Sequence, residues 1–236
     1  HENTLLIALD GLTYHSSTKI HCAECLQRQD SQGTLHYYHS AIVPVIVKPA
    51  CPHVLPLPPE LIVPQDGHEK QDCERAAVKR WLARQAQHDA AWTMTYLGDD
   101  LYANQPLCQQ IAETYQQFFV FVCKPDSHET LYREVALLEK VAGVTTLTQR
   151  QWNGRQAEIW TYRFATHLPL RAGNDPLLVN WLELTITRAK SGELLFRNAW
   201  VTNHSLSAQT VAPLAQAGRT RWKVENETLN VLKNQG

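Results

Sequence analysis

Carboxylates at the ends of two predicted strands are the residues of this sequence best suited to chemistry. Asp10 follows the apolar run 5–9, and Asp99 and Asp100 follow the strand-like run 92–98. Because neighbouring strand residues point to opposite faces, only one of Asp99 and Asp100 is expected to face Asp10, and we choose Asp99. Aspartates at strand ends are also ordinary turn formers, and for each residue taken alone that alternative stays open.

A third carboxylate, Glu225, belongs to the helical pattern of residues 221–233. At about 100° per residue, Glu225 falls in the same apolar stripe as Trp222, whereas Glu227 falls on the opposite face. A carboxylate in a buried stripe is costly unless it is paired or bound to a metal. Arg221 lies one turn earlier, so a half-buried Arg221–Glu225 ion pair is the alternative to a metal site.

Three carboxylates from two strands and a helix can hold two divalent cations, which activate the attacking oxygen and stabilise the leaving oxygen in phosphoryl transfer. Hard oxygen ligands suit Mg²⁺ or Mn²⁺. We therefore predict that Asp10, Asp99 and Glu225 are the catalytic, metal-binding residues, with Glu227 as second choice for the third. Arg221 and Lys233 are predicted to bind the DNA phosphate beside them.

A second group of residues has the types and spacing of a zinc site. Cys22 and Cys25 form a CxxC, and ten residues separate Cys25 from the pair His36 and His39. Sulfur and imidazole ligands in two close pairs suit tetrahedral Zn²⁺, which predicts a zinc knuckle over residues 22–39. If the histidine segment is a regular strand, the two imidazoles point to opposite sides. The alternative is a polar hairpin whose cysteines and histidines are incidental.

The other cysteines are predicted to be reduced. Cys73, Cys108 and Cys123 lie in apolar-periodic segments that are typical of buried thiols. No basic-then-apolar segment opens the sequence, which favours a cytoplasmic protein. The longest apolar runs are too short to cross a bilayer, so no membrane partner is expected.

Composition favours a soluble globular protein. Of 236 residues, 44% are hydrophobic and 19% are charged, which argues against disorder. A formal net charge of −1 argues against a protein that grips DNA over its whole surface. The strand pattern begins almost at once after His1, so we expect this chain to be an excerpt of a longer protein.

The order of elements predicts an α/β protein with a ribonuclease-H-like mixed sheet flanked by helices, and a β-rich insertion before the last helix. Alternating β-formers dominate residues 144–203, and helical patterns occupy 69–88, 105–117, 128–140 and 207–233. The predicted domains are the first part of the core (1–140), the insertion (141–204) and the C-terminal catalytic helix (205–236).

Several segments resemble the DDE transposases of bacterial insertion sequences, in particular the group with a β-strand insertion between the second Asp and the Glu. The resemblance extends over nearly the whole chain and rests on order and spacing. Its segments are LIALDG (6–11), LGDDLY (97–102), GRTRWKVEN (218–226) and PQDGHEKQDCE (64–74). It implies Asp10, Asp99 and Glu225 as the catalytic triad of a catalytic-core fragment.

The family places Tyr, Arg, Glu and Lys along its last helix. Arg221 and Glu225 match the Arg-to-Glu spacing, whereas Gly218 stands at the Tyr position and Lys233 lies one residue further from Glu225 than usual. In relatives with the insertion, a late tryptophan handles flipped bases, and Trp200 resembles that position. A core tryptophan in a sheet is the alternative for Trp200.

The resemblance implies an enzyme that cleaves transposon ends and joins them to target DNA, acting as a homodimer on paired ends with Mg²⁺ or Mn²⁺. Two alternatives remain open. One is an inactive transposon remnant or zinc-stabilised DNA-binding module, suggested by Gly218 and the near-neutral charge. The other is a ribonuclease-H-like nuclease without strand transfer.

Overall fold

The computed structural model describes residues 4–64, 73–88 and 92–223, and it is a mixed α/β protein. The chain divides into two compact units. The N-terminal unit contains Leu5–Trp92 together with Arg221–Gly236, and the β-rich unit contains His1–Thr4 together with Thr93–Thr220. Each unit is described separately below. None of the described helices combines the length and the apolar composition that crossing a membrane requires.

The first sheet of the N-terminal unit is short and antiparallel. Strand β1 (Leu5–Ala8) pairs with β5 (Val45–Val47), which in turn pairs with β6 (Leu55–Pro56). Ile7, Ala8 and the following Leu9 are at most 1% exposed, as expected for a continuous apolar run. Leu9 and then Asp10 follow this strand along the chain.

The second sheet of the N-terminal unit has the order β2-β4-β3, with β7 (Glu60–Ile62) also paired to β4. Its strands are β2 (Gly11–Ser17), β3 (Leu26–Gln29) and β4 (Leu35–Ile42). The β2–β4 ladder contains a bulge, because Thr13 pairs with Ser40 and His15 with the very next residue, His39. Tyr14 is therefore the extra residue of β2 at this point.

Helix α1 (Glu74–His88) packs against β4 and β7 through one apolar face. Trp81 is 1% exposed, and its indole Nε1 donates to the carbonyl of Pro58 at 3.1 Å. The Nε atom of Arg80 donates to Glu60 of β7 at 2.9 Å, and Arg84 also pairs with Glu60. A helix was predicted over 69–88, of which residues 69–72 lie outside the described part.

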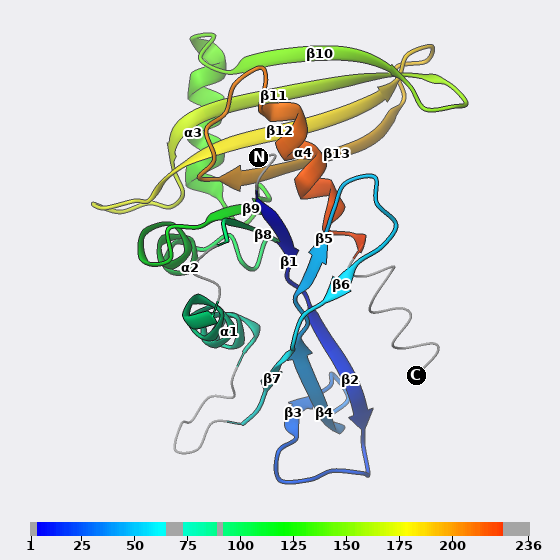
Figure 1. The fold of residues 1–236 in the computed structure, drawn as a ribbon, viewed down its shortest axis with the longest axis vertical. Coiled ribbons are helices and arrows are strands. Elements are labelled where there is room, and N and C mark those ends of the chain that lie inside the picture. Colours follow the sequence, from blue (N-terminus) through cyan, green and yellow to red (C-terminus); the bar gives the residue numbers. More distant parts are fainter. Residues whose placement is uncertain (1–3, 65–72, 89–91, 224–236) are drawn as a thin grey trace. The chain divides into compact units, whose positions relative to one another are not determined.

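The β-rich unit contains six strands of a mixed sheet, in the order β10-β11-β12-β13-β9-β8 (Figure 1). Its two parallel neighbours, β8 (Met94–Gly98) and β9 (Phe118–Val122), are connected by α2 (Gln105–Gln109) and a π-helical turn, η1 (Gln110–Thr114). All other pairs are antiparallel, and the strands are β10 (Thr145–Trp152), β11 (Ala157–Pro169), β12 (Leu178–Arg188) and β13 (Leu194–Thr202). The β-rich pattern predicted for 144–203 is these four strands.

Two helices cover opposite faces of this sheet (Figure 1). Helix α4 (Val211–Thr220) contacts the face that carries Trp160 and Trp200, whereas α3 (Glu129–Lys140) contacts the face that carries Arg163 and Trp181. Side chains alternate between the two faces along a strand, and Trp160 and Arg163 are three positions apart on β11. The two sets therefore point to opposite sides of the sheet. The apolar core of the unit therefore has two layers, one beneath each helix.

Candidate functional site

Asp10 lies two residues after the end of β1, and its carboxylate contacts Gly11 and Arg221 within the N-terminal unit. Its Oδ1 accepts a hydrogen bond from the Gly11 backbone N–H at 3.0 Å, and its Oδ2 lies 3.4 Å from Nη1 of Arg221. Both side chains of this ion pair are about four-fifths buried, at 18% and 19% exposure. An Arg221–Glu225 ion pair was the alternative to a metal site. The structure pairs Arg221 with Asp10, while Glu225, Glu227 and Lys233 lie outside the described residues.

Glu74 is a carboxylate that lies against Gly11, the residue after Asp10, and it was not predicted from the sequence. A Cβ atom added to Gly11 would lie 2.3 Å from Oε1 of Glu74, so the carboxylate lies directly against the Gly11 backbone. Only glycine at position 11 permits this approach. Glu74 is the first residue of α1. Acidic residues are common in the first turn of a helix because they interact favourably with the helix dipole, so the sequence alone did not indicate a contact with Gly11.

Asp99 and Asp100 follow β8 in the β-rich unit and have different surroundings. Asp99 accepts the Leu101 backbone N–H at 2.9 Å, which is a local turn contact. Asp100 accepts the Lys124 N–H at 2.7 Å and the Ser127 hydroxyl at 2.6 Å. Asp100 thus fixes the segment that leads into α3, where Ser127 binds Asp100 and His128 occupies the N-cap position.

The predicted triad remains a prediction, because its members are distributed over two units and an undescribed segment. Asp10 belongs to the N-terminal unit and Asp99 to the β-rich unit. The prediction that Trp222 lies in a buried apolar stripe is wrong. Trp222 is 47% exposed, and the adjacent Lys223 is 8% exposed, with Nζ donating to the carbonyls of Lys48 (2.8 Å) and Cys51.

Cys22, Cys25 and His39 form a group that can hold a metal ion, and within the described part of the chain it is the one group of its kind. The two Sγ atoms lie 3.8 Å apart, and Nε2 of His39 lies 3.4 Å from Cys22 Sγ and 3.3 Å from Cys25 Sγ. The cysteines lie in the turn before β3, and His39 lies in the middle of β4. The Cys22 backbone N–H donates a hydrogen bond to Cys25 Sγ at 3.3 Å.

His36, the fourth predicted zinc ligand, does not join this group. It pairs with Arg28 of β3, and its Nε2 lies 3.0 Å from Oδ2 of Asp30. This hydrogen bond is the main cause that lowers the pKa of the Asp30 carboxyl. The odd spacing between His36 and His39 on a regular strand explains the separation.

The remaining cysteines are divided between buried and accessible thiols. Cys108 and Cys123 are 0% and 2% exposed, and burial raises the pKa of each thiol, which keeps it neutral and unsuited to metal binding. Cys73 was predicted to be buried. This prediction is wrong, because Cys73 precedes α1 on an exposed turn of chain.

Trp200, the predicted base-stacking residue, is a core residue of the β-rich unit. Its side chain is 0% exposed and lies under α4, where a Cβ on Gly218 would come within 2.6 Å of the indole Nε1. No face of the indole is open to a nucleotide base. The glycine at position 218 lets α4 pack directly on the buried Trp200, so the predicted stacking role of Trp200 is wrong.

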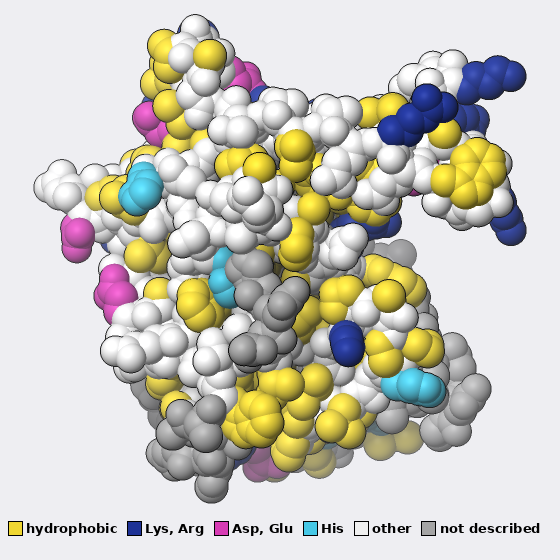
Figure 2. All heavy atoms as spheres, turned by 45° about the horizontal axis from the view of Figure 1, so that its top comes forward, with side chains coloured by type: hydrophobic (Ala, Val, Ile, Leu, Met, Phe, Trp, Pro, Cys, Tyr) yellow, Lys and Arg dark blue, Asp and Glu magenta, His cyan; other side chains and the backbone are white. Residues whose placement is uncertain are grey.

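An exposed aromatic residue with basic neighbours lies instead at one end of the meander, which is the run of consecutively paired strands β10–β13. We call this set the basic hairpin end; its members are Arg150, Trp152, Arg155, Arg188 and Lys190. The turns after β10 and β12 lie side by side there, because Glu158 pairs with Arg188 and the Ala189 N–H donates to Ala157 O at 2.9 Å. Trp152 is 68% exposed, and Figure 2 shows dark blue Lys and Arg side chains gathered at the upper right.

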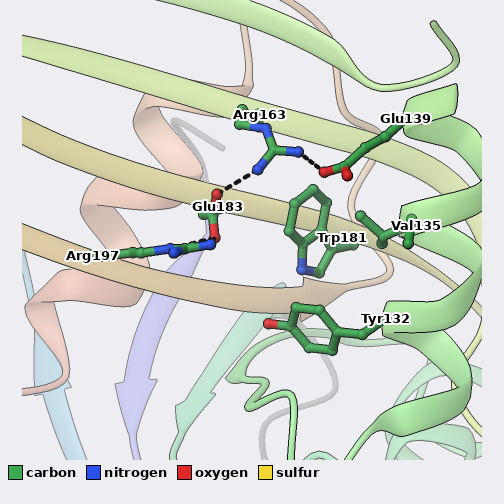
Figure 3. A pocket seen from close by; sticks show the side chains of 8 residues that line it. Tyr132, Val135, Glu139, Arg163, Trp181, Glu183 and Arg197 are labelled. Carbon is green, nitrogen blue, oxygen red and sulfur yellow. Dashed lines mark hydrogen bonds and ion pairs between the residues drawn. The ribbon is translucent and has the colours of Figure 1, made fainter.

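A small pocket of about 140 Å³ lies between α3 and strands β11–β13 (Figure 3). Glu183 accepts from Arg163 Nη1 at 2.9 Å and from Arg197 Nε at 2.8 Å, and Arg163 also pairs with Glu139. Two arginines against two glutamates leave no excess charge with which to hold an anion. The pocket wall is thus a structural ion-pair network.

Comparison with known proteins assigns no family to this chain. A scan against protein-family models finds no match, and a search of curated proteins finds none either.

Proposed function

We propose that this chain is the catalytic core of a DDE-type DNA transposase, which cleaves DNA at transposon ends and joins it to a target. The observation that carries the proposal is the order of elements along the chain. Asp10 lies two residues after the end of β1, and Asp99 directly follows β8. A four-stranded meander (β10–β13) then separates Asp99 from α4 and the segment of Glu225. The parallel pair β8–β9 beside that meander is what a ribonuclease-H-like core with a β insertion requires.

In this proposal Asp10, Asp99 and Glu225 hold two Mg²⁺ or Mn²⁺ ions. When bound, the cations supply activation of the attacking oxygen and stabilisation of the leaving oxygen. Carboxylate oxygens are the right donors for these hard cations. In this proposal Arg221, whose Nη1 lies 3.4 Å from Oδ2 of Asp10, binds a DNA phosphate once a cation neutralises the Asp10 carboxylate.

The basic hairpin end is the proposed DNA contact of the meander. Flexible basic side chains bind phosphates, and an exposed indole stacks on unpaired bases. We propose that Trp152 takes the base-stacking role that Trp200 cannot. The expected partners are transposon-end and target DNA, with a homodimer as the active complex in the bacterial nucleoid.

The test is Mn²⁺-dependent nicking of supercoiled plasmid by the full chain, together with joining of a 3′-hydroxyl oligonucleotide to that plasmid. Asp10→Asn, Asp99→Asn and Glu225→Gln should each lower nicking at least about 100-fold. The controls Asp126→Asn and Glu227→Gln should leave it unchanged. Nicking without joining would support a ribonuclease-H-like nuclease, and nicking that survives Asp10→Asn would contradict both enzymes.

A zinc-stabilised DNA-binding module is the second candidate, favoured by the Cys22, Cys25 and His39 geometry. With Zn–S near 2.3 Å and Zn–N near 2.0 Å, a tetrahedral site spaces two sulfurs about 3.8 Å apart and sulfur and nitrogen about 3.5 Å apart. The observed 3.8, 3.4 and 3.3 Å agree with these spacings, so we propose Zn²⁺ as the metal. DNA binding without any Mn²⁺-dependent nicking would favour this candidate over the enzyme.

A further inference from the structure

We infer that His15 is the fourth ligand of this metal group, so that Cys22, Cys25, His39 and His15 form a closed structural zinc site. The inference rests on the proposed zinc identity but not on transposase activity. It replaces His36, which faces away and pairs with Asp30.

The register of the second sheet brings His15 to the group. His15 of β2 pairs directly with His39 of β4, and residues opposite each other in an antiparallel ladder share a face. The bulge at Tyr14 sets this register, since a regular ladder continuing from Thr13–Ser40 would place Tyr14 opposite His39. Bulges often redirect a side chain toward a functional position in this way.

The distance between the two imidazoles is close to that of a shared metal. The ring centroids of His15 and His39 lie 5.9 Å apart with planes inclined by 41°. Two imidazoles on one tetrahedral zinc have centroids roughly 5 Å apart, given Zn–N of about 2.0 Å. The ring nitrogens of His15 do not lie within 4.8 Å of all three other ligand atoms, so its half-buried side chain must turn toward the metal when the ion binds. Tyr14 stacks on His39 at 5.7 Å and limits movement of that ring.

Four protein ligands leave no position for water or substrate, which defines a structural rather than a catalytic zinc. Two thiolates and two neutral imidazoles also balance the charge of Zn²⁺. The site would join β2, β4 and the turn before β3. Few apolar side chains hold these three segments together. In β2, for example, Leu12 is the one residue classed as buried.

The experiment measures zinc content and Co²⁺ spectra of the full chain. Wild type should contain one zinc per chain, and its Co²⁺ form should show the intense visible bands of tetrahedral coordination with thiolate charge transfer. Cys22→Ser and His39→Ala should abolish these bands. His15→Ala should retain the metal with water in its place, weaken affinity at least 10–100-fold, and shift the visible bands. His36→Ala and Cys73→Ser are the matched controls and should change nothing.

The outcomes separate the two claims. If wild type binds zinc but His15→Ala leaves affinity and spectrum unchanged, the fourth ligand is wrong and the three-ligand site stands. If His36→Ala has the effect expected of His15→Ala, the ligand set is likewise overturned. A Cys22–Cys25 disulfide, or no metal in freshly reduced protein, would overturn the zinc proposal itself. Plasmid nicking is scored in the same preparations and judges the enzyme proposal independently.

Discussion

Gly218 of α4 lies directly on the indole of Trp200, so close that a methyl group at position 218 would come within 2.6 Å of Nε1. The large, rigid ring is fully buried and has no flexible end that can move aside. We expect Gly218→Ala to destabilise the fold by about 1–2 kcal/mol. Overpacking costs about 1–3 kcal/mol, and the better helix propensity of Ala returns somewhat less than 1 kcal/mol. Chemical denaturation measures the change.

The control for this helix is Gln216→Ala at an exposed position, which should change the free energy of unfolding by less than about 0.5 kcal/mol. A double-mutant cycle with Trp200→Phe tests the contact itself. The smaller ring should absorb part of the Gly218→Ala cost, and strict additivity of the two changes would argue against direct packing.

His204 makes the β-rich unit sensitive to acid. It is buried, stacks on Phe118 at 4.1 Å, and contacts Thr95 Oγ1 at 2.9 Å. Burial lowers its pKa to about 4 from an ordinary 6.5. Because the unfolded chain then binds more protons between pH 6.5 and 4, the contribution is fully present above pH 6.5 and is lost as pH falls toward 4. The full loss is roughly 3 kcal/mol.

Measuring the free energy of unfolding from pH 7 to 4 tests this contribution. His204→Gln should flatten the slope, whereas His53→Gln, at an exposed site, should leave it as in wild type. An unchanged slope in His204→Gln would assign the acid sensitivity to other groups.

Glu183 holds two arginines with one buried carboxylate. Its side chain is 5% exposed, whereas Arg163 and Arg197 are 27% and 60% exposed and can turn toward water. We therefore expect Glu183→Gln to cost about 1.5–3 kcal/mol, less than breaking a fully buried pair. Glu193→Gln removes the solvent-exposed partner of Arg188 and should cost under about 1 kcal/mol. Equal costs in thermal unfolding would contradict the buried network.

The basic hairpin end should bind DNA without contributing to stability. Trp152→Ala is expected to lower affinity for a fluorescent oligonucleotide with a single-stranded overhang by about 5–100-fold, the range for one stacked base. Arg155→Gln with Lys190→Gln should weaken binding and reduce the salt slope by about 2. Trp92→Ala, exposed but in the other unit, is the control. A wild-type salt slope in the double variant would exclude this surface.

The sequence was sufficient to predict the strands before Asp10 and Asp99, because apolar runs and turn residues are local signals. Strand β1 was predicted as 5–9, β8 as 92–98, and the β meander as 144–203. The predicted helix 105–117 is in fact α2 followed by a π-helical turn. The spacing of apolar residues does not predict this change in the hydrogen-bonding pattern of the helix.

Contacts between residues that are distant in the sequence could not be predicted from the sequence alone. Alternation showed that His36 and His39 cannot share a face, but only the strand register and the bulge at Tyr14 select His39. Arg221 has a carboxylate partner 211 residues away, Asp10, where the helical wheel offered a nearby one. Trp200 was assigned a surface role because nothing local reveals the helix that covers it.

The meander has a kinetic consequence. In β10–β13 each strand pairs with the next one along the chain, through short connections. Hairpins of this kind close within microseconds, whereas pairing β9 with β13 must enclose the whole intervening segment. We therefore expect the β insertion to fold early and to serve as a template for β9, so that destabilising changes in the meander slow refolding while changes around Asp10 mainly accelerate unfolding.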